Sequence, residues 1–216
     1  MFSYLPGPLL AQTRAFFETE ALLPSQLQAR DNFIFLFRLH QDDTYTEQTT
    51  LEQFMVCLDE FFFAGQLTRG GILQRLEYEP DIFASAPTEG YGRRGRLSHG
   101  DVRTSTPFGE SRLAPRPSDG RWVVTISMDP NDQVDGLPHP LHNLLETLVH
   151  ELVHSFLHSF LCYCGPCRAE KTWAGVLGPT GHGRLFVELL HSIVRVIRGW
   201  DKDLAALYVL DDFSDA

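Results

Sequence analysis

The chain has 216 residues, of which 43% are hydrophobic and 12% aromatic, enough for one substantial core and too few for two full domains. A net charge of -10 disfavours a stand-alone nucleic-acid-binding protein, because polyanions are repelled at long range. No apolar run is long enough to cross a membrane, and the first residues do not resemble a secretory signal. We therefore expect an intracellular protein with no membrane contact, and the nucleus is one candidate location within the cell.

The first 47 residues carry two weakly patterned segments. Residues 8–23 alternate apolar and polar side chains at a helical period, and Phe33–Leu39 is an apolar run that fits either a helix or a strand. We predict a mainly helical N-terminal extension over residues 1–47, followed by the main domain over 48–200 and by a short helix and tail over 201–216.

A capping-box pattern at residues 49–53 predicts the start of the next helix, which continues through a strongly apolar segment to Phe62. Gly65 is placed to end that helix. Two β-strands are then predicted, at Ile72–Tyr78 and at Trp122–Met128, because both segments are rich in β-branched and aromatic residues and are bounded by turn residues.

Residues 84–120, between those strands, predict a long loop with a short strand near Arg94–Leu97. The segment from residue 93 to residue 121 contains seven arginines and three acidic residues. Contact with nucleic-acid phosphates through this segment is one interpretation, and a solvated loop is the commoner explanation for such a run.

The sequence His150-Glu151-Leu152-Val153-His154 is an H-E-x-x-H motif. Leucines and phenylalanines recur at helical spacing from about residue 140 to residue 161, and on a helix two histidines four residues apart share one face. Both imidazoles can then reach one zinc ion, with the carboxylate of Glu151 beside them as general base. The alternative is a pair of hydrogen-bonded core histidines, which would leave several buried polar groups in need of partners.

A catalytic zinc ion usually takes three protein ligands, so a third is needed. His182 is the best candidate, because Gly181 and Gly183 flank it and a helix is predicted over His182–Trp200. A short helix over Lys202–Leu210 is also predicted. If the zinc-bound water attacks a carbonyl group, the oxyanion that forms also needs a stabilising group. The candidates are Tyr91 and His191.

From residue 50 to residue 199 the chain resembles the SprT-like zinc metalloproteases. The resemblance rests on the F-F-x-G-x-L pattern that ends at Leu67, on the H-E-x-x-H motif, and on the G-H-G-x-x-F pattern around His182. It implies an α+β fold of zincin type, with a small β-sheet and an active-site helix. It also implies zinc on His150, His154 and His182, with Glu151 as general base and acid.

The resemblance thus implies a zinc endopeptidase that hydrolyses peptide bonds of a protein or peptide substrate with a zinc-bound water activated by Glu151. DNA-associated or crosslinked proteins are candidate substrates, although the net charge disfavours DNA as a partner and no basic tail follows the protease-like region. A zinc-stabilised protein- or nucleic-acid-interaction module without catalysis is the alternative.

Three of the four cysteines form a C-x-C-x-x-C group after the predicted helix that carries the H-E-x-x-H motif. His158 lies one helical turn before the first of them, so a second, structural zinc site is a hypothesis, and reduced or partly paired cysteines are the alternative. The ligands of that site would be His158, Cys162, Cys164 and Cys167.

Overall fold

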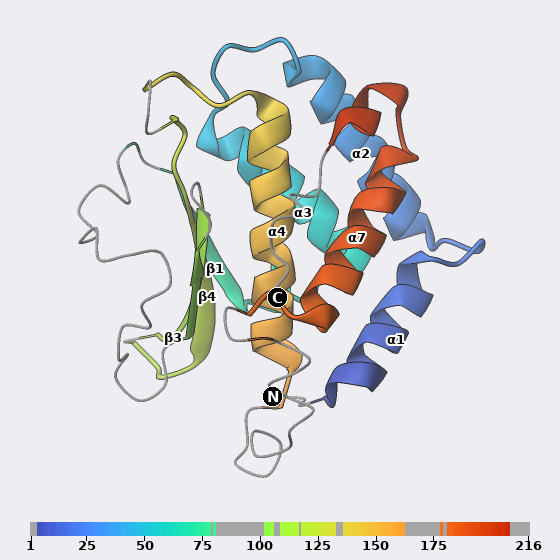
Figure 1. Ribbon diagram of the computed structural model, residues 1–216, viewed down its shortest axis with the longest axis vertical. Coiled ribbons are helices and arrows are strands. Elements are labelled where there is room, and N and C mark those ends of the chain that lie inside the picture. The colour runs from blue at the N-terminus through green and yellow to red at the C-terminus, as the bar shows by residue number, and fades with distance from the viewer. Residues whose placement is uncertain are drawn as a thin grey trace.

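A computed structural model gives the fold of the chain (Figure 1). Five α-helices, one 3-10 helix and one four-stranded sheet lie within the part that it describes, which confirms the α+β class. None of these helices has the length and apolar character that crossing a bilayer requires. The residues described are 4–78, 80, 102–105, 109–116, 118–132, 136–162, 178 and 181–207.

The sheet is mixed, with the order β1-β4-β3-β2. Strand β1 (Leu73–Tyr78) pairs in parallel with β4 (Trp122–Met128), so both predicted strands are confirmed. Strand β3 (Gly109–Pro115) pairs antiparallel with β4, and β2 (Val102–Ser105) pairs antiparallel with β3. The prediction of a long loop over residues 84–120 is therefore wrong for the part that forms β2 and β3.

Strand β3 was missed because its inward face carries almost no hydrophobic signal. Gly109, Ser111 and Leu113 are the buried residues of the strand, and only the last is a large apolar residue. Gly109 lies where the sheet approaches helix α4 (Leu141–Phe160) closely, so there is little room for a side chain at that position. The strand predicted near Arg94–Leu97 lies outside the described residues.

Helix α4 (Leu141–Phe160) is the centre of the molecule, as its apolar sequence predicts. It packs on β3 and β4 on one side and on α3 (Gln48–Phe63) and α7 (Arg184–Arg198) elsewhere. Figure 1 shows α4 between the sheet and α7, with α1 beyond α7. Every residue of α4 from Thr147 to Phe160 is buried, so a side chain in the middle of this helix meets protein on all sides.

The N-terminal segment forms two helices, α1 (Pro6–Phe17) and α2 (Pro24–His40), so Phe33–Leu39 is helical. Phe33 belongs to the same core cluster as α3 and α4, and its ring lies 5.2 Å from that of Trp200. The residue after Trp200, Asp201, caps the 3-10 helix η1 (Lys202–Ala206), which occupies part of the predicted terminal helix. The boundaries predicted at residues 47 and 200 stay predictions.

The predicted capping box of α3 is wrong. The helix begins at Gln48 after the N-cap Glu47, and the Thr49 hydroxyl lies 3.4 Å from the Glu47 carboxylate and caps no backbone amide. The physical reason is a contact with the sheet, because the Gln48 amide donates a 2.8 Å hydrogen bond to the carbonyl of Leu76 in β1. This bond joins the first turn of α3 to the strand, and Glu47 takes the N-cap position.

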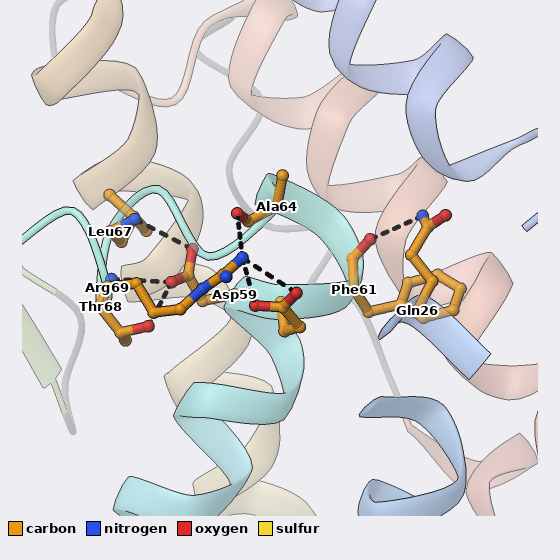
Figure 2. A network of polar contacts seen from close by, with 8 residues as sticks. Gln26, Asp59, Phe61, Ala64, Leu67, Thr68 and Arg69 are labelled. Carbon is orange, nitrogen blue, oxygen red and sulfur yellow. Dashed lines mark hydrogen bonds and ion pairs between the residues drawn. The ribbon is translucent and has the colours of Figure 1, made fainter. Parts of the chain in front are cut away.

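The end of α3 agrees with the prediction. Ala64 has a left-handed backbone, Gly65 follows with φ of 69°, and the Gly65 amide donates to the carbonyl of Asp59. The Asp59 carboxylate then accepts hydrogen bonds from the backbone amides of Leu67 and Thr68, which Figure 2 shows. The turn from α3 into β1 is thus fixed by one buried carboxylate.

Candidate metal centre

Helix α4 and the start of α7 place three imidazoles against one another. His150 and His154 are one turn apart on α4, and His182 comes from the segment just before α7. Gly181, with φ of 88°, adopts the left-handed backbone that glycine favours, and Gly183 is the N-cap of α7. His182 therefore lies in a short turn between two glycines, directly before the first turn of α7.

The three Nε2 atoms form a nearly equilateral triangle. His150 and His154 are separated by 3.1 Å, and the Nε2 atom of His182 lies 3.0 Å from each of the other two. The side chains are 5%, 1% and 7% exposed in the order of the sequence. This group could hold a metal ion.

Three such contacts cannot all be hydrogen bonds between the rings. An imidazole nitrogen either carries a proton and donates or has a lone pair and accepts, so among three nitrogens at least two have the same role and face each other unfavourably. A cation at the centre removes the conflict, because all three lone pairs then point at a positive charge.

The size of the triangle also fits an ion. With sides of 3.0 to 3.1 Å, each nitrogen lies ~1.8 Å from the common centre, which is less than the ~2.0–2.1 Å of a zinc–nitrogen bond. All three nitrogens could therefore bind one ion of that size together. Three imidazole donors suit zinc and several other transition metals, so the donors alone do not identify the ion.

Burial keeps the α4 imidazoles in the form that binds metal. It lowers the pKa of His150 to about 3, with a smaller contribution from repulsion by His182, and it lowers the pKa of His154 well below its ordinary value. A metal ion must displace any proton on a ligand nitrogen, so rings that are neutral at pH 7 bind without that competition.

Phe186 on α7 contacts all three imidazoles. Its ring centroid lies 4.7 Å from that of His150, 4.2 Å from His154 and 4.9 Å from His182, and the side chain is fully buried. One flat apolar ring thus limits how far each ligand can turn. The sequence pattern includes this phenylalanine, but nothing in the pattern says that it touches the three histidines.

Glu151 follows His150 on α4 and is fully buried. On a helix it projects about 100° from His150, and its side chain lies against Gly109, the first residue of β3. The hydroxyl of Ser155 donates a 2.7 Å hydrogen bond to the Glu151 carbonyl, so Ser155 is satisfied within the helix.

The structure describes only two of the four residues of the proposed second zinc site. His158 is buried one turn after His154, its ring is stacked on that of His154 at 5.8 Å, and burial lowers its pKa to about 4. Cys162 is partly exposed, whereas Cys164 and Cys167 lie outside the described residues, so this site stays a prediction. Among the described residues, the histidine triangle is the group that could hold a metal ion.

The sequence offers two candidates for oxyanion stabilisation, Tyr91 and His191. Tyr91 lies outside the described residues, and His191 is half-buried in the middle of α7. Comparison with known proteins adds no assignment, because no family model, curated protein or solved structure matches the chain.

Proposed function

We propose that this protein is a zinc-dependent endopeptidase of SprT-like type. The observation that carries the proposal is the convergence of three buried imidazole nitrogens, with Glu151 buried directly after His150 on α4. This donor set, two histidines from H-E-x-x-H and one distant histidine, is typical of hydrolytic zinc sites with an open coordination position.

In this proposal His150, His154 and His182 would hold the ion, and Phe186 fixes their rings. When bound, the ion supplies a Lewis acid and makes water a nucleophile at neutral pH. Glu151 accepts the proton of the attacking water and passes it to the amine that leaves. Exclusion of water around the buried carboxylate strengthens its electrostatic contribution.

The substrate is proposed to be a protein or peptide chain, and DNA-associated or crosslinked proteins are candidates within that class. The net charge of -10 disfavours direct binding of DNA, so DNA dependence needs a direct test.

A zinc-stabilised interaction module without catalysis is the second candidate. One observation favours it, because the three histidines are at most 7% exposed and a substrate chain has little access to their nitrogens. In that case zinc would stabilise the fold by joining α4 to α7, and Glu151 would take no part in proton transfer.

The test is cleavage of unfolded protein substrates by the purified full chain loaded with zinc. We expect Glu151→Gln to bind zinc at the same stoichiometry and to lose at least ~1000-fold in kcat/KM, because the amide keeps the shape of the side chain and cannot accept the proton. Glu146→Gln, on the same helix, is the matched control and keeps the activity.

The assay is run alone, with single-stranded DNA and with double-stranded DNA. Cleavage that is equal in wild type and Glu151→Gln would come from a contaminant and would contradict the proposal. Stoichiometric zinc that stabilises the protein with no cleavage under any of the three conditions would favour the interaction module.

A further inference from the structure

Strand β3 begins in close contact with helix α4, at Gly109. A Cβ atom added to this glycine would lie 2.6 Å from Cγ2 of Thr147 and 3.1 Å from Cγ of Glu151. It would also lie 3.3 Å from the Glu151 carboxylate oxygen Oε1. Carbon atoms in ordinary contact are ~3.5–4.0 Å apart, so no side chain fits at this position unless its neighbours move.

The backbone at Gly109 does not itself require glycine. Its φ is not among the positive values of the described residues, and it pairs in regular register with Met128 of β4. Any residue could adopt this conformation. The requirement for glycine is therefore one of space, and the space is filled by two residues of α4.

Thr147 and Glu151 are one helical turn apart, so they point to the same side of α4. The strand meets both of them from that side with bare backbone. The metal ligands are held by a different residue, Phe186 of α7. Two separate elements thus restrict the two functional parts of the cluster.

We propose that Gly109 is a positioning residue for Glu151, because its missing side chain lets strand β3 hold the carboxylate in the place from which it receives the proton. This inference rests on the proposed peptidase function. It assigns a role in catalysis to a strand that supplies no metal ligand and no proton acceptor.

The two contacts of a new Cβ can be separated by mutation. In Gly109→Ala the severe overlap is with Thr147 Cγ2, and the smaller displacement is of Glu151. Thr147→Ser removes Cγ2 and leaves the contact with Glu151. If Gly109 has only a structural role, adding Thr147→Ser to Gly109→Ala restores stability and activity together. If Gly109 positions Glu151, adding Thr147→Ser restores stability alone.

The experiment measures Tm, bound zinc, kcat and KM for Gly109→Ala, Thr147→Ser and the double variant as zinc-loaded full chains. We expect Gly109→Ala to lower Tm by ~5 °C and the double variant to recover most of that loss. We expect kcat to be ~10- to 100-fold lower in both, with KM and zinc content unchanged. Gly7→Ala is the matched control, because a Cβ there meets no atom within 4 Å.

Recovery of both Tm and kcat in the double variant would overturn the inference, as would a normal kcat in Gly109→Ala. If Gly109→Ala does not fold, the kcat of the double variant is compared with that of Thr147→Ser instead. A double variant that also fails to fold would show that the contact with Thr147 is not the main cause of destabilisation and would overturn the inference.

A carbon-13 NMR measurement keeps this test distinct from that of the proposed function. The side-chain carboxyl resonance of Glu151 is assigned by its disappearance in Glu151→Gln. We expect it to shift in Gly109→Ala and in the double variant but not in Gly7→Ala. If the wild-type chain shows no Glu151-dependent cleavage, the proposed function fails. In that case the inference about Gly109 is decided by the Glu151 resonance alone. If the resonance does not shift in Gly109→Ala, the inference fails as well. If it does shift, Gly109 still sets the position of the Glu151 carboxylate.

Discussion

A single phenylalanine connects the three candidate metal ligands. Phe186 stacks on His154 with an interplanar angle of 23° and meets His150 and His182 with its edge or face at steeper angles. Orientation of the ligands by surrounding groups is part of what sets metal affinity. The ring is therefore expected to act on zinc binding without touching the ion.

Replacement of Phe186 by leucine tests that role. Leucine keeps an apolar side chain but loses the flat ring, so the imidazoles gain freedom and zinc affinity is expected to fall ~10-fold. The measurement is a competition titration against a chromophoric chelator. Phe17→Leu, in the same core but in contact with Phe62, is the control and should lose stability while keeping its zinc affinity. Equal affinities for wild type and Phe186→Leu would contradict the prediction.

At the scale of residues, the sequence predicts side chains that a helix brings together and misses those that meet across the fold. His150, Glu151 and His154 follow from helical spacing, and His182 follows from its glycine neighbours. Gly109 gives no such signal. Its contacts are with residues about forty positions away, and its own contribution is the absence of a side chain.

At the scale of elements, the turn between α3 and β1 depends on Asp59. The carboxylate accepts bonds of 3.1 Å from the Leu67 amide and 2.7 Å from the Thr68 amide, and it also accepts a 2.6 Å bond from the Thr68 hydroxyl. Burial raises the pKa of Asp59, and these hydrogen bonds oppose that rise by favouring the charged form. The loop therefore has a defined path into the sheet (Figure 2).

Asp59→Ala is expected to lower the free energy of unfolding by ~2–4 kcal/mol, because two backbone amides lose their acceptor in a buried turn. Urea denaturation followed by circular dichroism measures the change. Glu60→Ala is the control, since Glu60 pairs with the exposed Arg69 and such surface pairs contribute at most ~1 kcal/mol. A loss for Asp59→Ala no larger than that of Glu60→Ala would contradict the capping role.

The elements that could be predicted are those with a strong apolar pattern. Helices α3, α4 and α7 and strands β1 and β4 carry such patterns and were predicted close to their observed bounds. Strands β2 and β3 were missed, and the start of α3 was misplaced because a hydrogen bond from Gln48 to β1 is a tertiary contact. Patterns within one segment carry no information about which other segment it will meet.

At the scale of the whole molecule, both ends of the described chain join the core. The amide of Gln26 in α2 donates to the carbonyls of Phe16 in α1 and Phe61 in α3, and the latter bond appears in Figure 2. Arg38 in α2 donates a 2.9 Å hydrogen bond to the carboxylate of Asp201. Loss of the N-terminal helices would therefore expose the side of α3 and α7 that they cover.

The buried histidines of α4 make the stability of the metal-free protein depend on pH. Burial lowers the pKa of His150 to about 3 and of His158 to about 4, and it lowers that of His154 in the same direction. Below the ordinary histidine pKa of ~6.5 the unfolded chain binds protons that the folded chain does not bind. Their contribution to folding is therefore complete at pH 7 and is lost as the pH falls from ~6.5 toward 4.

We expect the free energy of unfolding of chelator-treated protein to fall by ~1.4 kcal/mol per pH unit for each of these histidines, or ~4 kcal/mol per unit for the three, below pH 6. Chemical denaturation at several pH values between 7.5 and 5 measures the slope. His158→Gln should remove about one third of it, because one buried proton-binding group is lost. A slope that His158→Gln does not alter would mean that this ring is as accessible to protons in the folded chain as in the unfolded one.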